Sequence, residues 1–321
     1  MHHILLFSIS AFIFLFAIYG FDTNMLAEQK TPTFCKNSTY TAICTTMKSV
    51  PIPLSNFLRG AFYQLSISRK GWPSFILGHT SINGWWYYYP VSFVLKNQLP
   101  LSIFLLLFFL LFFLHKNFRS QSGVSDRFLL LFLVPTILYF MIFSKLNIGL
   151  RYLFPLFPIV FLLCGRTTVF LLKKNAWTSL LAISLLLWYI ASWIQDSSYP
   201  LSYSNELTGG PGKTFLSLSD SDNDWGQGLP QLKKYMDTKN IPSVALLYFG
   251  YDEPSRYGIT STNFPLEHCQ SLSGFVAIST TPLMNPFYTK NRNCIEWVKT
   301  HAVSSNLVGY TIQTFQLPKL Q

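Results

Sequence analysis

The chain has 321 residues, of which 50% are hydrophobic and 12% are charged. An ordinary soluble domain carries about 25% charged residues, so this composition is not typical of one. The net charge of +11 comes from scattered basic residues that accompany no nucleic-acid-binding motif. We therefore exclude nucleic acid as a partner, and we expect these cations to set membrane topology and to contact anionic lipid head groups.

Five apolar stretches precede residue 195, and each approaches the length of about 20 residues that crosses a membrane. They are Ile4–Tyr19, Gln98–Leu114, Phe128–Ser144, Tyr152–Leu172 and Trp177–Ile194. The sequence predicts a mainly α-helical membrane protein with about five transmembrane helices. The first stretch lacks a basic leading region and a clear cleavage site, which favours an uncleaved anchor; a cleaved signal peptide is the alternative.

Lysine and arginine in short loops predict the orientation of these helices. Lys116, Arg119 and Arg127 separate the second and third stretches, and Lys173 and Lys174 follow the fourth. Both loops are therefore expected on the cytoplasmic side of a bacterial cytoplasmic (inner) membrane. The predicted parts are an N-terminal helix (1–20), an extracytoplasmic loop (21–97), a four-helix region (98–194) and an extracytoplasmic domain (195–321).

The five cysteines are distributed in a way that bears on compartment. Cys35 and Cys44 share the first outer loop, Cys269 and Cys294 share the C-terminal domain, and Cys164 lies in an apolar stretch. Two pairs outside the membrane fit two disulfides in an oxidising compartment. Four unpaired small core residues are the alternative.

The C-terminal domain alternates strand-like and helix-like segments, which predicts a small α/β domain. The predicted strands are Phe215–Ser219, Val244–Phe249, Phe275–Ser279 and Leu307–Phe315, and the predicted helices are Leu229–Lys239 and Ile295–His301.

The densest polar feature of this domain is the segment 220–227. Asp220, Asp222 and Asp224 alternate as at the start of a calcium loop, but Trp225 stands where that loop needs glycine, and no glutamate closes it. We expect no cofactor, with a divalent metal on these aspartates as the alternative. The preferred interpretation is a helix N-terminal turn in which Asp224 either caps the helix that begins at Leu229 or places its negative charge at the start of that helix.

An aromatic cluster that contains Trp85, Trp86 and Tyr87 precedes the second stretch, and Lys96 follows it. Such a cluster is either an interfacial belt or a stacking surface for a sugar or lipid carrier. Lys96 either extends to the interface or contacts a phosphate. Arg151, at the membrane edge, either anchors to lipid phosphates or binds the phosphate of a lipid-linked substrate, because guanidinium matches phosphate oxygens in a bidentate way.

Three stretches, in this order and spacing, resemble bacterial membrane glycosyltransferases of family 39, the protein-mannosyltransferase-like branch of the GT-C fold. They are Gly84–Pro100, then Leu146–Pro155, and then Ser204–Pro211 together with Asp220–Gln227. The resemblance covers roughly residues 51 to 258 and corresponds to the C-terminal half of those enzymes. It implies sugar transfer from a polyprenyl-phosphate carrier to an acceptor outside the cytoplasmic membrane.

The resemblance assigns this chain the carrier-binding side of such a site. Lys96 and Arg151 become phosphate contacts, and Trp85, Trp86 and Tyr87 become a cavity wall. The family's catalytic acid lies in the first outer loop, and here Asp22 and Glu28 do not sit in that acidic motif. The catalytic residue is therefore unknown, with Asp220, Asp222 and Asp224 as possible substitutes.

Three functions follow as hypotheses. The chain is a glycosyltransferase half that works with a separately encoded N-terminal part, or it is a non-catalytic remnant or lipid-carrier-binding accessory protein. A transporter or channel is the third hypothesis; it is disfavoured because the spans show neither an acidic pathway nor a repeat.

Overall fold

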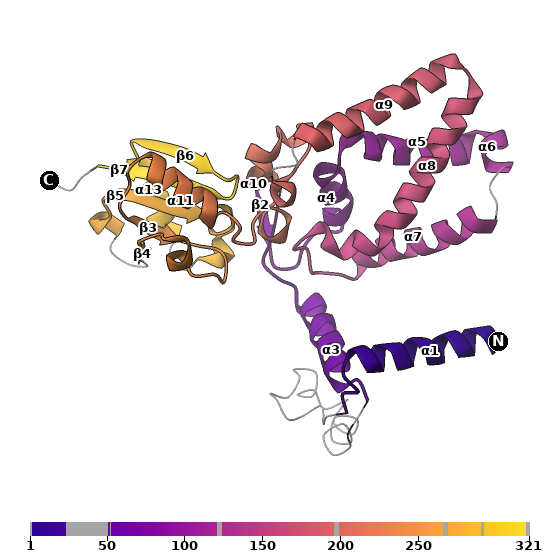
Figure 1. Cartoon of the computed structure of the whole chain (residues 1–321), viewed down its shortest axis with the longest axis horizontal. Coiled ribbons are helices and arrows are strands. Elements are labelled where there is room, and N and C mark those ends of the chain that lie inside the picture. Colours follow the sequence, from indigo (N-terminus) through magenta and orange to yellow (C-terminus); the bar gives the residue numbers. More distant parts are fainter. Residues whose placement is uncertain are drawn as a thin grey trace. The chain divides into compact units, whose positions relative to one another are not determined.

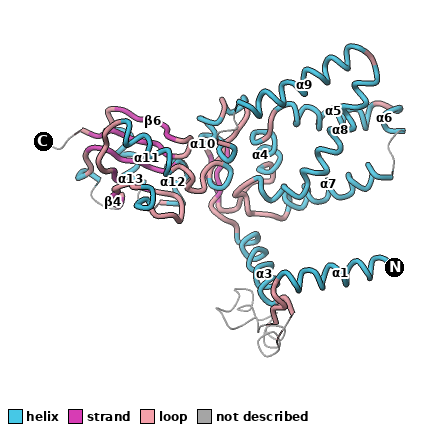
Figure 2. The backbone as a smooth tube through the Cα atoms, viewed as in Figure 1, coloured by secondary structure: helices cyan, strands magenta, loops and turns pink. Residues whose placement is uncertain are grey.

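The computed structural model describes residues 2–23, 51, 53–120, 124–195, 199–265, 269–289 and 292–318. The chain divides into two compact units, Met1–Gly71 and Trp72–Gln321, and each is considered separately. Among the described residues, helices dominate the part before residue 195, and all strands but a short hairpin lie after residue 240 (Figures 1 and 2).

The first unit contains helices α1 (His2–Ile18) and α3 (Ser55–Lys70). Asp22 follows α1 and holds the beginning of α3. One of its carboxylate oxygens accepts from the Ser55 hydroxyl at 2.8 Å and from the Asn56 N–H at 2.7 Å. Asp22 thus satisfies one of the N–H groups that a helix leaves without partners in its first turn, that of Asn56.

The second unit begins with a hairpin of β1 (Ser74–Ile76) and β2 (His79–Ser81) and continues into helices. The helices are α4 (Tyr88–Lys96), α5 (Leu99–Leu114), α6 (Lys116–Ser120), α7 (Val124–Ile142), α8 (Phe157–Lys174) and α9 (Ala176–Gln195), with a 3₁₀ segment Leu150–Leu156 leading into α8.

All five predicted apolar stretches are helical over most of their length. In the described part of the chain, Leu150–Lys174 and Ala176–Ile194 are long and apolar enough to cross a membrane. Only 33% and 17% of their most apolar windows are buried by protein. Both helices therefore present most of their apolar surface outward, unlike the core helix of a soluble protein.

The C-terminal part contains a five-stranded mixed sheet in the order β4-β3-β5-β7-β6. Strands β4 and β5 both run parallel to β3, and β7 runs antiparallel to both β5 and β6. The strands are β3 (Val244–Leu247), β4 (Ser261–Asn263), β5 (Gly274–Ser279), β6 (Ser304–Val308) and β7 (Ile312–Leu317).

Helices cover both faces of this sheet, as an α/β domain requires. Helix α11 (Leu229–Thr238) shares a core with Ala277 of β5, and α13 (Arg292–His301) shares another with Val276 and Ile278. The side chains of β5 alternate between the two cores because successive residues of a strand point to opposite faces. Figure 1 shows these helices beside the strands.

The predicted α/β domain is thus confirmed in outline, but two of its predicted strands are wrong. Residues 215–219 do not form a strand: Thr214–Ser217 is the short helix α10, and only Leu218 pairs, in a single bridge with Ile76. The buried Thr214 hydroxyl donates to Ser202 O at 2.7 Å and fixes the chain here. The alternation of apolar and polar residues therefore did not determine the secondary structure of residues 215–219.

The predicted strand Leu307–Phe315 is two strands, β6 and β7, joined by a tight turn. Gly309 and Tyr310 both have positive φ, 57° and 62°, and the Thr311 N–H donates to Val308 O. A turn with positive φ at both central positions joins antiparallel strands of natural twist. Helix α12 (Thr280–Met284) and strand β4 lie outside the predicted segments.

Candidate functional site

One face of α4 carries three polar side chains at four-residue spacing: Tyr88, Ser92 and Lys96. Residues four apart lie on the same side of a helix, and here all three contact Asp222. The Tyr88 and Ser92 hydroxyls donate to one carboxylate oxygen at 2.9 and 2.8 Å, and the Leu150 N–H donates to the other at 2.7 Å. Asp222 is therefore a buried carboxylate whose two oxygens are both occupied by protein donors.

Lys96 completes this face of α4. Its ammonium group donates to the carbonyl oxygens of Leu201, Tyr203 and Asp222 at 2.7, 2.6 and 2.5 Å. An ammonium group has three N–H donors, so these contacts use all of them, and a phosphate would have to displace one. Burial lowers the Lys96 pKa to about 8, and the negative charge of Asp222 acts in the opposite direction.

The loop at residues 144–151 packs against the start of α4. Asn147 accepts the Trp85 N–H at 2.6 Å, and Leu146 O accepts the Tyr89 hydroxyl at 2.5 Å. Gly84 has a φ of 68°, and a side chain there would overlap the Asn147 amide. Glycine is thus required at residue 84 for two separate reasons.

Asn205 joins the third stretch to the opposite end of α4. Its N–H donates to Leu95 O at 3.0 Å, and its amide group donates to the carbonyls of Val94 and Asn97. These are among the last carbonyls of the helix, which have no partner within it. The three stretches identified in the sequence therefore meet around α4. We call α4, residues 144–151 and residues 220–227 together the junction site.

Arg151 lies at the junction site with its guanidinium over two aromatic rings. The guanidinium carbon is 4.7 Å from the centre of the Trp225 ring and 5.4 Å from that of Tyr152, so both contacts are cation–π interactions. No acceptor among the described residues forms a hydrogen bond with this guanidinium. Its N–H donors are available to a ligand.

Asp220 lies close enough to Arg151 for their charges to interact. Burial raises the pKa of its carboxyl group, whereas the Tyr288 hydroxyl, the Ser221 N–H and the Arg151 charge act in the opposite direction. Tyr288 donates to Asp220 and accepts from the Trp72 indole N–H at 2.9 Å. The Asp220 carboxylate is thus held by the Tyr288 hydroxyl and is close enough to the Arg151 guanidinium for their charges to interact.

Asp224 is almost fully buried, with 1% of its surface exposed. Its carboxylate accepts the Gly226 N–H at 2.8 Å, which closes a local turn. Burial raises its pKa to about 7. The predicted helix cap at Asp224 is wrong, because the residue that precedes α11 in the cap position is Gly228, and no side chain caps that helix.

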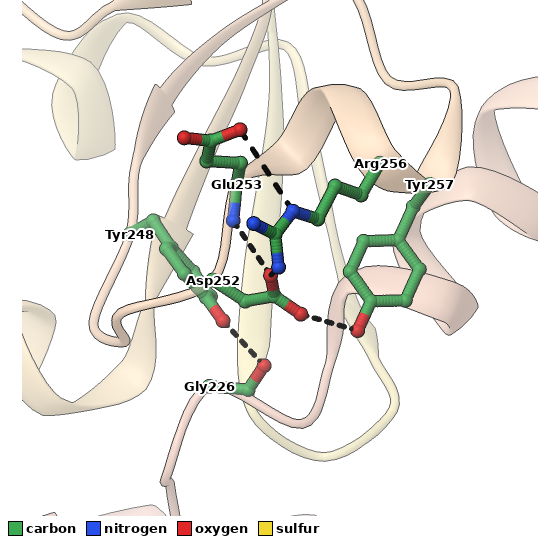
Figure 3. Close-up of polar contacts among 6 residues, drawn as sticks. All are labelled: Gly226, Tyr248, Asp252, Glu253, Arg256 and Tyr257. Carbon is green, nitrogen blue, oxygen red and sulfur yellow. Dashed lines mark hydrogen bonds and ion pairs between the residues drawn. The ribbon is translucent and has the colours of Figure 1, made fainter.

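The junction site lies at the carboxyl edge of the parallel strands. Asn223 donates to the Thr280 hydroxyl at 2.9 Å, just beyond β5, and Tyr248, just beyond β3, donates to Gly226 O at 2.6 Å (Figure 3). The next loop is held by Asp252, which accepts the Tyr257 hydroxyl at 2.7 Å. This edge of an open parallel sheet is a common position for ligands.

The three aspartates point toward different partners. Asp220 contacts Tyr288, Asp222 contacts α4, and Asp224 contacts Gly226. In the described part of the chain, no three His, Cys, Asp or Glu side chains are grouped to hold a metal ion. The alternating pattern in the sequence therefore corresponds to three separate contacts.

The aromatic residues before α4 differ in exposure. Trp86 is 65% exposed, and its ring meets the edge of Tyr87 with centroids 5.7 Å apart. Trp85 and Tyr87 are partly buried against the helical core. None of the three lines the apolar cavity of about 270 Å³ beside α4, which is formed by residues of α4, α5, α7, α8 and the 3₁₀ segment, among them Phe93, Leu153 and Leu156.

The predicted disulfide between Cys269 and Cys294 is present, with Cα atoms 5.1 Å apart, and it attaches a loop to α13. Cys164 is free and buried. Cys35 and Cys44 lie outside the described residues, so their pairing stays a prediction.

Comparison with protein-family models, with curated proteins and with solved structures finds no match for this chain.

Sequence reasoning singled out Arg151 and Lys96, and both lie at the junction site. It missed Tyr88 and Ser92, whose hydroxyls hold Asp222. The signal was available: polar groups at residues 88, 92 and 96 define one polar face of an otherwise apolar helix. It also missed Asn147 and Asn205, because nothing local in the sequence marks an amide that serves a distant backbone.

Proposed function

We propose that this chain is a multi-pass protein of the bacterial cytoplasmic membrane that binds a polyprenyl-phosphate-linked sugar at the junction site. The membrane part of the proposal rests on α8 and α9, which are apolar and little covered by protein, and on the clustering of cations at one end of the helices. In this orientation the junction site and the α/β domain face the extracytoplasmic side.

The observation that supports the binding proposal is that the Arg151 guanidinium has no hydrogen-bond acceptor among the described residues. A guanidinium held over the Trp225 ring, with its N–H donors unused by the described residues, is prepared to bind a phosphate. Lys96 is already bonded to three carbonyls, so we assign it the role of holding α4 to residues 201–222. Arg151 is therefore the phosphate contact, and Lys96 positions the elements around it.

The apolar cavity supplies a place for the carrier's chain. Leu153 and Leu156 line it and belong to the same 3₁₀ segment as Arg151. A ligand with a phosphate at one end and an isoprenoid chain next to it would match this arrangement, in which the Arg151 cation is followed by the apolar wall at Leu153 and Leu156.

The reaction we propose is transfer of the sugar to an extracytoplasmic acceptor, with a separately encoded N-terminal part supplying the base. Transfer needs a base for the acceptor and cations for the leaving phosphate. Among the described residues of the junction site, both oxygens of Asp222 are occupied by protein donors and Asp224 is almost fully buried, which leaves Asp220 beside Arg151. That same observation favours the second candidate function, a non-catalytic carrier-binding accessory protein.

Binding of polyprenyl phosphate to the purified full chain tests the proposal. We expect Arg151→Ala to weaken binding about tenfold or more, because a charge-assisted hydrogen bond contributes about 1.5–3 kcal/mol. Lys239→Ala is the control: it removes the same charge from an exposed residue outside the junction site. Equal affinity in wild type and Arg151→Ala would contradict the assignment.

A sugar-transfer assay separates the two candidate functions. Sugar transfer by the chain alone would refute the non-catalytic accessory function, whereas transfer only in the presence of a separately encoded N-terminal part would support the glycosyltransferase half.

A further inference from the structure

A second cavity, of about 790 Å³, lies at the other end of the helical region, where α5, α6 and α8 meet. Its volume is in the range of about 300–1,000 Å³ that ligand pockets occupy. Its lining is both cationic and apolar, and consists of His115, Asn117, Phe118, Phe161, Leu162, Gly165, Arg166, Val169, Phe170, Lys173 and Lys174.

The base of this cavity is a fixed aromatic and ionic cluster. Phe118 is fully buried, and its ring meets that of Phe170 with centroids 4.9 Å apart. Arg166 lies over the Phe118 ring at 4.2 Å, donates to Phe118 O at 2.6 Å and pairs with Asp126. These contacts hold the wall in place before any ligand arrives.

Among the residues that the structure describes, no carboxylate forms an ion pair with the two lysines of the cavity, Lys173 and Lys174. Asp126 is the sole acidic residue between Leu99 and Ile194 in the sequence, and Arg166 already occupies it. The Lys174 ammonium approaches His115 at 3.4 Å, and Lys173 is exposed at the end of α8. The cavity therefore favours an anion.

The other wall of the cavity is apolar and runs along α8 away from the lysines. Leu162 is 61% exposed, and Val169 is 50% exposed. Leu162, Arg166, Val169 and Lys173 recur at the spacing of one helix face. A ligand lying along this face would meet Lys173 at one end, and Val169 and Leu162 on either side of Arg166, whose charge is already paired with Asp126.

We infer that this cavity binds the phosphate head group of an anionic glycerophospholipid, whose acyl chains lie along Leu162 and Val169. The inference uses the membrane insertion proposed above, but not carrier binding at the junction site. In that orientation the cavity faces the cytoplasmic leaflet, where anionic lipids attract basic residues near the surface.

The test compares dioleoyl-phosphatidylglycerol with dioleoyl-phosphatidylcholine by native mass spectrometry of the full chain. We expect the anionic lipid to bind about tenfold more tightly, because each nearby lysine contributes about 1 kcal/mol toward an anionic surface. Soluble glycerol 1-phosphate should not displace the lipid at equal concentration. Equal binding of the two lipids, or displacement by glycerol 1-phosphate, overturns the proposal.

Variants locate the site. The double variant Lys173→Gln, Lys174→Gln should lose about tenfold in affinity for phosphatidylglycerol. Lys116→Gln with Arg119→Gln removes the same charge from residues that do not line the cavity, and it should retain affinity within about twofold. An equal loss in both double variants would show a diffuse surface effect and refute a specific site.

A variant without charge change guards against loss of folding. A side chain at Gly165 meets nothing within 4 Å and would project from the cavity wall, so Gly165→Leu should weaken lipid binding without disturbing the helix. Gly60→Leu is its control, since Gly60 is also an exposed helical glycine with open space beside it. Unchanged lipid affinity in Gly165→Leu contradicts the inference.

Discussion

At the scale of single residues, the structure turns on buried carboxylates that serve different purposes. Asp222 is 3% exposed and receives three donors from two other segments of the chain. Its substitution leaves those donors without an acceptor, and an unsatisfied buried donor is costly.

We predict that Asp222→Asn lowers the free energy of unfolding by about 2–4 kcal/mol, since the amide presents hydrogens toward groups that also donate. Thermal unfolding of the full chain in detergent measures this loss. Asp237→Asn is the control, because the Asp237 side chain is exposed and forms an i,i+4 ion pair with Lys233; its effect should stay within about 0.5 kcal/mol. Similar melting of the two variants would refute the role of Asp222.

Asp224 gives a prediction in the pH dependence of stability. Burial raises its folded-state pKa to about 7, above the ordinary value of 3.8. Between these values the folded state keeps a proton that the unfolded state releases, so stability falls as pH rises from about 4 to about 7. We expect a loss of about 2 kcal/mol between about pH 5 and pH 8.

Asp224→Asn should remove this contribution and be more stable than wild type at about pH 8. Unfolding temperatures of both proteins across this pH range provide the measurement. If the two curves stay parallel, Asp224 does not carry the raised pKa.

At the scale of elements, glycine at residue 84 lets the loop before α4 approach Asn147. Gly84→Ala should destabilise the chain in two ways, through its positive φ and through overlap with the Asn147 amide. Gly78→Ala isolates the first effect, because Gly78 has a φ of 85° and open space around it. We expect about 1 kcal/mol for Gly78→Ala and about 1–3 kcal/mol more for Gly84→Ala. Equal unfolding temperatures would show that the close approach has no cost.

The disulfide between Cys269 and Cys294 closes a segment with a sequence separation of 25 residues. Reduction should lower the free energy of unfolding by about 3 kcal/mol, mostly by freeing the unfolded chain. Melting with and without reductant measures the effect in a background with Cys35→Ala and Cys44→Ala, and Cys294→Ala in that background should abolish it. Cys164→Ala serves as the control that keeps the reductant sensitivity. A wild-type melt that reductant leaves unchanged would refute a stabilising disulfide.

Elements with a strong internal pattern could be predicted from the sequence, and those decided by distant contacts could not. Helix α11 and strands β3 and β5 lie where the apolar patterns indicated. Residues 215–219 alternate like a strand, but Thr214 bonds Ser202 and the segment turns into a helix instead. The turn at Gly309 and Tyr310 was missed because a tyrosine with positive φ is uncommon.

At the scale of the whole molecule, the sequence predicted that Lys96 and Arg151 would serve the same site. Both belong to the junction site, where each contacts the segment 220–227. Their difference could not be predicted: one cation is bonded to three carbonyls, and the other lies over an aromatic ring. Both are lone cations beside apolar helices in the sequence, and only the fold brings carbonyls to Lys96.

Orientation in the membrane yields a further prediction for the whole chain. Single cysteines introduced at Lys116 and at Lys239, in a background without Cys35, Cys44 and the free Cys164, should differ in labelling by a membrane-impermeant maleimide in intact cells. Lys239 follows α11 and is exposed, so it should react from outside, whereas Lys116 should react only after lysis. Labelling of both positions in intact cells would contradict the proposed topology.

The proposed function places a polyprenyl phosphate in the junction site and the adjoining apolar cavity. A polyprenyl phosphate with a photoreactive group on its first isoprene unit tests this most directly, by mapping where it attaches to the full chain. We predict attachment within α4 and the segment Leu150–Leu156, prevented by unlabelled polyprenyl phosphate but not by uncharged polyprenol. Attachment spread over the exposed faces of α7 and α9, or equal competition by polyprenol, would contradict the account.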